Sequence, residues 1–495
     1  MTLLRTSAMR CRRALPLALS AALSACAVGP RYAAPEAPSA GYTVKPLTQT
    51  LPAAGSGGVA QRLAYGASVS SKWWESFGSP ALDRLIARAL AHNPGLESAQ
   101  RTLEQARYEL KAAQGIFYPQ VALGASGERS RTSGAQSGGR VGPTLYNLYT
   151  GQVSVSYAPD AFGLHRLVAQ NAQAQVDVAR DQLIAAQLAI EGNVANAVLD
   201  LAALEARIEA TAKTIADQQA ILELIRTQYR SGAVSGLQVA AQESQLASTQ
   251  AQLPLLELAR DRVRHLLATY LGEFPSQASG LPLPRLSELH LPAVLPVSLP
   301  SALVRERPDI RAAEAQLRAA NAQVGEAVAR LYPDLLLSAD YGAQSNGWRS
   351  LFDPANRIWD LAAAAAAPLF DGGTLEAQKH AAQAAYDALF ADYRGTVLGA
   401  FRDVADALRA LERDAAALDA QARALQAART AFTLARSQYQ AGAVDYLNLL
   451  TSEVQYQNAR VAYIGAQAQR YADSAALYVA LGGGAAAAPG PRRTE

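Results

Sequence analysis

The sequence predicts a mainly α-helical fold with a membrane β-barrel, built from one structural unit used twice. Three observations predict it: apolar residues recur every seven positions over long stretches, short segments alternate apolar with polar residues, and both patterns occur twice in the same order. With 495 residues, 50% of them hydrophobic, the chain is long enough for more than one folding unit. Two cysteines exclude a disulfide-stapled fold, and the abundance of alanine favours long helices.

The first 25 residues are typical of a bacterial secretory signal. Four arginines precede the apolar run Ala14–Ala25, which is shorter than the roughly 20 residues of a membrane-spanning helix. Leu23-Ser24-Ala25-Cys26 resembles the lipobox of bacterial lipoproteins, which implies cleavage before Cys26 and lipidation of this residue. Ala27, in place of Asp, implies sorting to the outer membrane. An ordinary signal peptide that happens to contain a cysteine is the alternative.

Removal of the signal also changes the charge and the chemistry of the chain. Its four arginines lower the formal net charge by four, from +3 to −1, so nothing basic remains to indicate nucleic-acid binding. The second cysteine, Cys11, and both methionines lie in the same segment. The mature chain therefore offers no soft ligand for monovalent copper or silver apart from the lipidated Cys26, which favours organic solutes over soft metals.

Proline and glycine divide the mature chain into segments. We expect a lipidated N-terminus and extended tether over residues 26–71, a first repeat over 72–272 and a second over 309–481. Seven prolines between 273 and 308 forbid a long helix there and predict a linker. Residues 482–495 are expected to form a disordered tail.

The two halves carry the same heptad series, which makes the repeat the most informative feature of the sequence. Leu96, Leu103 and Leu110 recur at a spacing of seven, and a shift of 214 leads to another such triplet, Ile310, Leu317 and Val324. A longer series follows in each half at a shift of 210: Val194, Leu201, Ile208, Ile215, Leu222 and Tyr229, then Val404, Leu411, Leu418, Leu425, Phe432 and Tyr439. Such spacing predicts helices packed as in a coiled coil.

These series predict one long helical hairpin in each half. A continuous helix over Leu164–Arg230 would be about 100 Å long at a rise of 1.5 Å per residue. A glycine in each Tyr-x-x-Gly element interrupts the pattern, and a second helical stretch follows, Leu237–Tyr270 in the first half and Leu447–Leu481 in the second. We therefore expect a tight tip at Gly232 and another at Gly442.

A strand hairpin is expected before each long helix. Residues 152–157 alternate apolar and polar side chains, as a strand with one apolar face requires, and 118–126 and 332–344 resemble this more loosely. Residues 357–370 are dominated by alanine and ambiguous, yet they occupy the repeat position of the strand that ends at Pro159. The hairpin loops then fall at 129–143 and 345–356.

Four strands can cross a bilayer but cannot close a barrel, because the smallest outer-membrane barrels have about eight strands. The chain must therefore oligomerise, with eight strands from two copies or twelve from three. The alternative is a soluble strand hairpin lying on a coiled-coil body.

These features together resemble the outer-membrane efflux protein family, of the TolC and OprM type, and in particular its NodT-type lipoprotein branch. The residues that carry the resemblance extend from Cys26 to about Gly484: the lipobox with Pro30, Tyr32 and Pro35, the run Trp73-Trp74-Glu75-Ser76-Phe77, then Pro80, Leu82, Leu85 and Ile86, Asn93-Pro94, the pairs Tyr118-Pro119 and Tyr332-Pro333, and both Tyr-x-x-Gly tips.

The resemblance implies a homotrimer in the outer membrane of a Gram-negative bacterium. Its twelve-stranded barrel would continue into the periplasm as a barrel of helices. It also implies a tripartite efflux system, in which an inner-membrane pump of the RND type passes small organic compounds to the channel through a periplasmic adaptor, giving multidrug resistance. A channel for protein or peptide secretion is one alternative, and a periplasmic coiled-coil adaptor or structural lipoprotein is another.

The resemblance also assigns roles at the tips. Adaptor docking would use Tyr229, Gly232 and Leu237 on the first tip and Tyr439 and Gly442 on the second, because hairpin tips offer bent backbone and exposed apolar side chains; the alternative is that the glycines only make the turns. A periplasmic gate would use Leu447 as an apolar constriction, with Tyr439 and Gln238 forming a hydrogen bond between neighbouring hairpins. Asn448 and Thr451 stand where relatives commonly carry carboxylates, which predicts weak block by divalent cations; the alternative is that both residues merely face solvent.

The sequence predicts no enzyme and no cofactor beyond the lipid on Cys26. The histidines are scattered without the spacing of metal ligands, and no constellation of a nucleophile with a base stands out: His92, His165, His265, His290 and His380.

Overall fold

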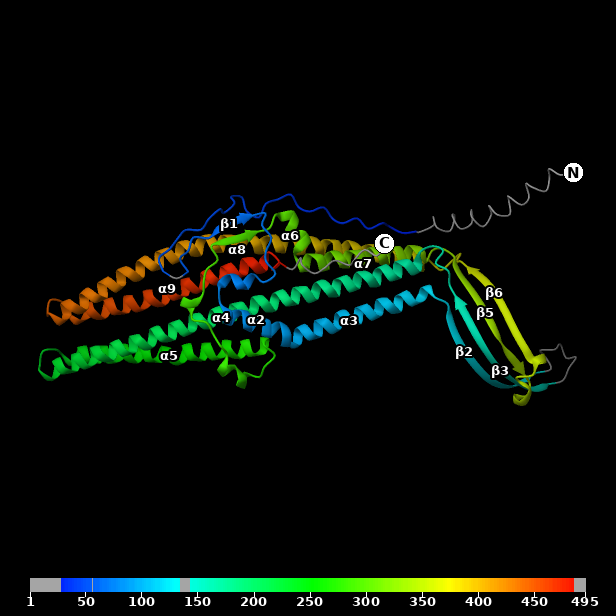
Figure 1. Cartoon of the computed structure of the whole chain (residues 1–495), viewed down its shortest axis with the longest axis horizontal. Coiled ribbons are helices and arrows are strands. Elements are labelled where there is room, and N and C mark those ends of the chain that lie inside the picture. The colour runs from blue at the N-terminus through cyan, green and yellow to red at the C-terminus, as the bar shows by residue number, and fades with distance from the viewer. Residues whose placement is uncertain (1–27, 56, 134–142, 485–495) are drawn as a thin grey trace. The chain divides into compact units, whose positions relative to one another are not determined.

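The computed structural model describes residues 28–55, 57–133 and 143–484 (Figure 1). These form two compact units. Unit 1 combines the chain up to Ala34 with Leu103–Ala179 and Ala313–Tyr393, and unit 2 combines Pro35–Thr102, Arg180–Ala312 and the chain from Arg394 onward. The signal peptide and Cys26 lie outside the described residues.

Unit 1 contains an antiparallel sheet in the order β2-β3-β5-β6. Its strands are β2 (Gln120–Thr132), β3 (Thr144–Tyr157), β5 (Asp334–Ser345) and β6 (Arg357–Ala366). Because side chains alternate along a strand, the register gives the sheet two different faces. The row Leu123, Val153, Tyr341 and Trp359 lies on one face and the neighbouring row Ala122, Ser154, Asp340 and Asp360 on the other. The sheet is thus apolar on one side and polar on the other.

The predicted strand positions are confirmed, although boundaries differ: β2 extends further than expected, and β6 ends at Ala366 rather than at Phe370. Residues 357–366 form β6 although they are rich in alanine, as their repeat position predicts. The first hairpin loop, expected over 129–143, begins later, because β2 continues to Thr132 and pairs there with Thr144. Cross-strand pairing extends the strand beyond the segment that alternates clearly.

Two pairs of helices of matching length make up most of the rest. Helices α4 (Leu164–Arg230) and α8 (Thr374–Gln440) have 67 residues each, and α5 (Gly236–Tyr270) and α9 (Tyr446–Ala480) have 35 each. Each strand hairpin follows a shorter helix, α3 (Pro94–Gln114) or α7 (Pro308–Ala329). Of the helices in the described ranges, none has the length and the apolar composition needed to cross a bilayer.

An aromatic cluster at the beginning of the first repeat lies in the core of unit 2. Trp73 and Phe77 are fully buried, and Trp73 stacks on Tyr478 of α9 with ring centroids 5.5 Å apart. Helix α2 (Pro80–His92) follows directly, with the Ser79 side chain accepting a hydrogen bond from the Leu82 amide as its N-cap.

Part of the predicted tether is packed, so the prediction of an extended tether is wrong for that part. Strand β1 (Arg62–Tyr65) pairs in parallel with β4 (Val294–Val297) of the linker. Beside it, the buried Gln61 donates to the Pro292 carbonyl and to the Ser474 hydroxyl. These contacts join residues that are far apart in the chain, so they leave no periodic signal in the sequence. The tail prediction is also wrong for residues 482–484, which form a turn packed on unit 2, whereas 485–495 lie outside the described residues.

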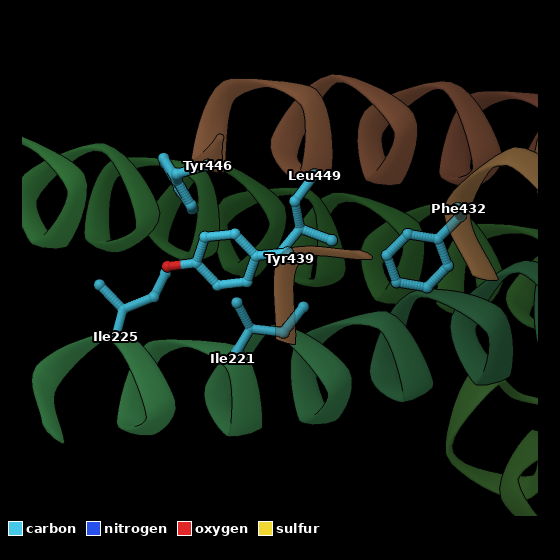
Figure 2. Close-up of a cluster of buried hydrophobic side chains, with 6 residues drawn as sticks. All are labelled: Ile221, Ile225, Phe432, Tyr439, Tyr446 and Leu449. Carbon is cyan, nitrogen blue, oxygen red and sulfur yellow. The ribbon is translucent and has the colours of Figure 1, made fainter. Parts of the chain in front are cut away.

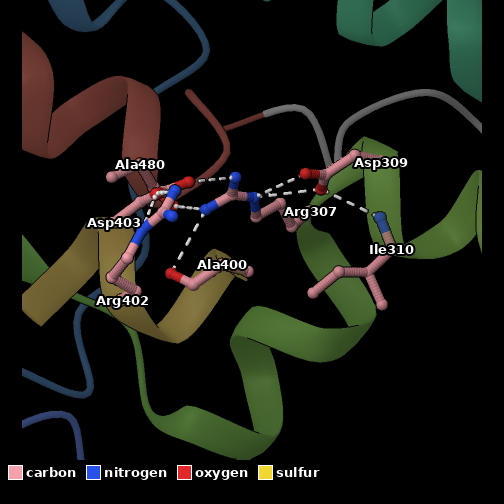
Figure 3. A network of polar contacts seen from close by, with 7 residues as sticks. All are labelled: Arg307, Asp309, Ile310, Ala400, Arg402, Asp403 and Ala480. Carbon is pink, nitrogen blue, oxygen red and sulfur yellow. Dashed lines mark hydrogen bonds and ion pairs between the residues drawn. The ribbon is translucent and has the colours of Figure 1, made fainter. Parts of the chain in front are cut away.

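The linker between the repeats contains only short elements, as its prolines predict: β4, α6 (Pro300–Glu306) and two 3-10 turns. Arg307 fixes its end (Figure 3). Its guanidinium, 14% exposed, pairs with Asp309 at 2.9 Å and with Asp403 of α8 at 2.8 Å, and donates to the Ala480 carbonyl at the end of α9. One side chain thereby connects the start of α7 with α8 and α9.

Candidate functional site

Both helical hairpins of unit 2 end in the same turn. Gly232 and Gly442 have φ of 79° and 72°, the left-handed conformation that glycine adopts without a steric cost. One residue further on, the Ala233 amide donates to the Gln228 carbonyl and the Ala443 amide to the Gln438 carbonyl, at 2.9 and 2.8 Å. This pattern caps the ends of α4 and α8 and reverses the chain. The predicted tips are confirmed.

A hydrophobic cluster holds the two tips together (Figure 2). Ile221 and Ile225 of α4 face Phe432 and Tyr439 of α8, and Tyr446 and Leu449 of α9 complete the cluster. Tyr439 and Tyr446 pack edge to face with their ring centroids 6.3 Å apart. The cluster therefore joins both hairpins within one chain.

Two tyrosine hydroxyls add polar links between the hairpins. Tyr439 donates to the Gln228 side chain at 2.8 Å, and Tyr446 donates to the buried Gln242 at 2.7 Å. The sequence had suggested Gln238 as the partner of Tyr439, but within the chain the partner is Gln228. Among the described residues, the buried side-chain oxygen of Gln238 has no hydrogen-bond partner.

The outermost apolar side chains of the tips face away from the cluster. Leu237 is 78% exposed and Leu447 66%, and Tyr229 is half exposed, so both tips present apolar surface to their surroundings. Asn448 and Thr451 are exposed in the first turns of α9. The Asn448 side chain donates to Asp445, the N-cap of α9, at 2.7 Å. This hydrogen bond holds Asn448 against the start of the helix.

A buried polar cluster beneath the second tip was missed by the sequence analysis. Gln218 and Gln242 are fully buried, the Gln242 amide donates to the Gln218 carbonyl, and Glu453 of α9 is buried near them. Burial raises the pKa of Glu453 to about 7. The available signal was the heptad itself, because Thr211 and Gln218 occupy core positions of α4 between Ile208, Ile215 and Leu222.

A mainly helical chain that carries a two-faced sheet and two joined helical hairpins has the architecture of outer-membrane channel proteins. The chain belongs to the family described as outer membrane efflux protein, whose sequence profile matches residues 85–273 and 299–483. It is accordingly a protein of the outer membrane of Gram-negative bacteria, in a family of channels rather than enzymes.

Individual relatives agree with this assignment. The pyoverdine export outer membrane protein OpmQ of Pseudomonas aeruginosa is 32% identical over 84% of this chain and 88% of its own length. Nodulation protein T of Rhizobium leguminosarum bv. viciae is 28% identical over 94% and 92%. The crystal structure of the outer membrane protein VceC from Vibrio cholerae superposes with a TM-score of 0.79 at 30% identity, over 84% of this chain and all of that one.

Proposed function

We propose that the protein is the outer-membrane channel of a tripartite efflux system, giving passive exit to small organic compounds. An inner-membrane pump, of the RND type, would deliver these compounds through a periplasmic adaptor. The names of the relatives support export, because OpmQ is named for pyoverdine export. The two joined tips support docking, since they present exposed apolar side chains on rigid turns.

The two-faced sheet is the observation that carries the proposal. In the order β2-β3-β5-β6, the outer strands β2 and β6 each have an edge that is not paired within the described sheet. A bilayer leaves no water to satisfy such edges, so several copies must join their sheets into a closed barrel. Three copies give twelve strands and the homotrimer that the sequence resemblance implies. The duplicated order of strands and helices supports a barrel in which both repeats contribute equally.

Closure would place the polar face toward the lumen and the apolar face toward lipid. Tyr341 and Trp359 are neighbours on the apolar face and strongly exposed in the single chain, as lipid-facing aromatic residues would be. Asp340 and Asp360 are neighbours on the polar face and would line the aqueous path. Mass measurement of the detergent-purified protein as a stable monomer would contradict this arrangement.

The gate is proposed to lie at the second tip. Three copies of the exposed Leu447 around one axis would form an apolar constriction from which water is excluded. Asn448 and Thr451 would form neutral polar rings beside it. Leu447→Ala should therefore raise planar-bilayer conductance. Leu237→Ala is the matched control, because it removes a leucine that is also largely exposed from the other tip. Equal conductance in both variants, or strong block of the wild type by millimolar calcium, would refute this gate.

Docking is proposed to use both tips: Tyr229, Gly232 and Leu237 on the first, and Tyr439 and Gly442 on the second. Space is open around both glycines, so a leucine there would strain the left-handed turn and project from it rather than clash inside the chain. Gly442→Leu should lower drug export while the oligomer persists. Unchanged resistance in a strain that lacks the native gene would leave only a turn-making role for the glycine.

A further inference from the structure

A groove in unit 1 lies where the first described residues cross two helices. Residues 28–32 form one wall, and the first turns of α4 and the middle of α7 form the others, enclosing about 470 Å³. Its charged lining residues are Arg31, Arg166, Asp177 and Arg318, and its polar ones include Gln170, Gln173 and Asn321.

The N-terminal wall of the groove is fixed in place. The Asn321 side chain donates to the Pro30 carbonyl at 3.1 Å, and the Tyr32 hydroxyl donates to Glu314 at 3.4 Å. Gly29, with φ of 109°, packs so closely on Gly325 that a Cβ on Gly29 would lie 2.9 Å from the Gly325 Cα. The groove is therefore built by specific contacts, and its shape depends on the two glycines.

The groove has an excess of positive charge. Its three arginines face one carboxylate, Asp177, which lies 3.6 Å from Arg318. Within the described ranges, the guanidinium groups of Arg31 and Arg166 have no carboxylate or hydrogen-bond acceptor as a partner, and both residues are exposed. Two unpaired guanidinium groups on one groove provide the planar donor sets that bind phosphate oxygens in pairs.

The position of the groove indicates the source of the phosphate. Val28 is two residues after Cys26, so the chain can separate the proposed point of lipid attachment from this wall of the groove by only about 7 Å. On another wall, Arg166 follows the end of β3 at Tyr157 by nine residues and stands in the first turn of α4. Under the proposed function, the strands cross the membrane and the helices begin beneath it. Both Val28 and Arg166 would therefore lie near the surface of the bilayer.

We propose that this groove binds the phosphate of an anionic phospholipid in the leaflet that holds the N-terminal anchor. Arg31 and Arg166 contact the phosphate oxygens, and Gln170 and Asn321 are placed to bind the glycerol hydroxyls of the headgroup. The bound lipid joins the anchored N-terminal segment to α4 and α7. This inference rests on the proposed membrane orientation and adds a ligand that the export function does not require.

The test uses the full-length, lipidated protein purified in detergent and examined by native mass spectrometry. The probes are dioleoylphosphatidylglycerol and its zwitterionic counterpart, dioleoylphosphatidylcholine. The wild type should retain the anionic lipid preferentially, and Arg31→Ala/Arg166→Ala should lower that retention by about tenfold, since two charge-assisted contacts are lost. Arg166→Ala alone should give an intermediate loss. Arg107→Ala, an exposed arginine of unit 1 outside the groove, is the matched control.

Three outcomes would overturn the inference. They are unchanged retention of the anionic lipid in the double variant, an equal loss in Arg107→Ala, and displacement of the lipid by millimolar inorganic phosphate, which would assign the groove to free phosphate. Lipid retention is measured without a pump or an adaptor. A failure of the export proposal in cells would therefore leave this result intact, and the reverse also holds.

Discussion

Tyr446→Phe tests whether the buried polar links hold the two hairpins in register. The change removes one oxygen and keeps the ring, so packing against Tyr439 and Leu449 is preserved. Gln242, which is fully buried, then loses the donor that lies 2.7 Å from its side-chain oxygen. Leaving a buried acceptor without a partner costs about 1–3 kcal/mol.

That cost sets the size of the expected effect. Since about 1.4 kcal/mol corresponds to a tenfold change in an equilibrium constant, opening of the second tip should become about 5–150 times more frequent. Hydrogen exchange of the amides in 441–450 reports this opening directly in the purified protein. Tyr439→Phe is the matched control: its partner Gln228 is only partly buried, so water can replace the lost donor and the acceleration should stay below about tenfold.

Two results would refute this reasoning. One is exchange in Tyr446→Phe within about twofold of the wild type, which would mean that the hydroxyl contributes nothing measurable. The other is a larger effect in Tyr439→Phe than in Tyr446→Phe, which would show that burial of the acceptor does not decide the cost.

Further predictions concern a proton, an ion-pair network and the anchor. Burial raises the pKa of Glu453 from 4.5 to about 7, so the native state holds this proton longer than the unfolded chain, and stability should fall as pH rises from about 4.5 to 7 and then level off. Glu453→Gln should flatten that part of a thermal-melting profile, and an unchanged slope would assign it to other groups. Arg307→Met should destabilise unit 2 by about 2 kcal/mol and speed proteolysis within the 273–308 linker, because the Ala480 carbonyl and Asp403 lose a donor; an unchanged melting temperature would contradict this. Cys26→Ser should abolish palmitate labelling, and label that persists would place the lipid elsewhere.

The periodic elements could be predicted from the sequence because each residue in them repeats one local environment. The heptad of α4 predicted a helix that the structure places at the same residues, Leu164–Arg230. Comparison of the two repeats also corrected an expectation based on local helix propensity. The alanines of β6 favour a helix when considered alone, yet the repeat position predicted the strand that pairs with β5.

What could not be predicted depends on partners far apart in the chain. The Arg307 network joins residues up to 173 positions apart, and no spacing in the sequence reveals which carboxylate the arginine selects. The candidate site could be predicted only in part, because some of its contacts also join residues that are far apart in the chain. The glycine turns follow from local chemistry, whereas the pairing of Tyr446 with Gln242 requires knowledge of how the two hairpins face each other.

The parallel ladder between β1 and β4 has a consequence for the order of events during export. Its two strands, Arg62–Tyr65 and Val294–Val297, are separated by more than two hundred residues, so β1 must wait until β4 has crossed the inner membrane. Until then β1 lacks its partner strand, so under the proposed lipidation of Cys26 the N-terminal segment stays accessible to the enzymes that would process the signal and attach the lipid. We therefore expect that closure of the ladder is not required for the proposed lipidation of Cys26, so a chain truncated before residue 294 should still be labelled with palmitate yet remain sensitive to protease near Arg62.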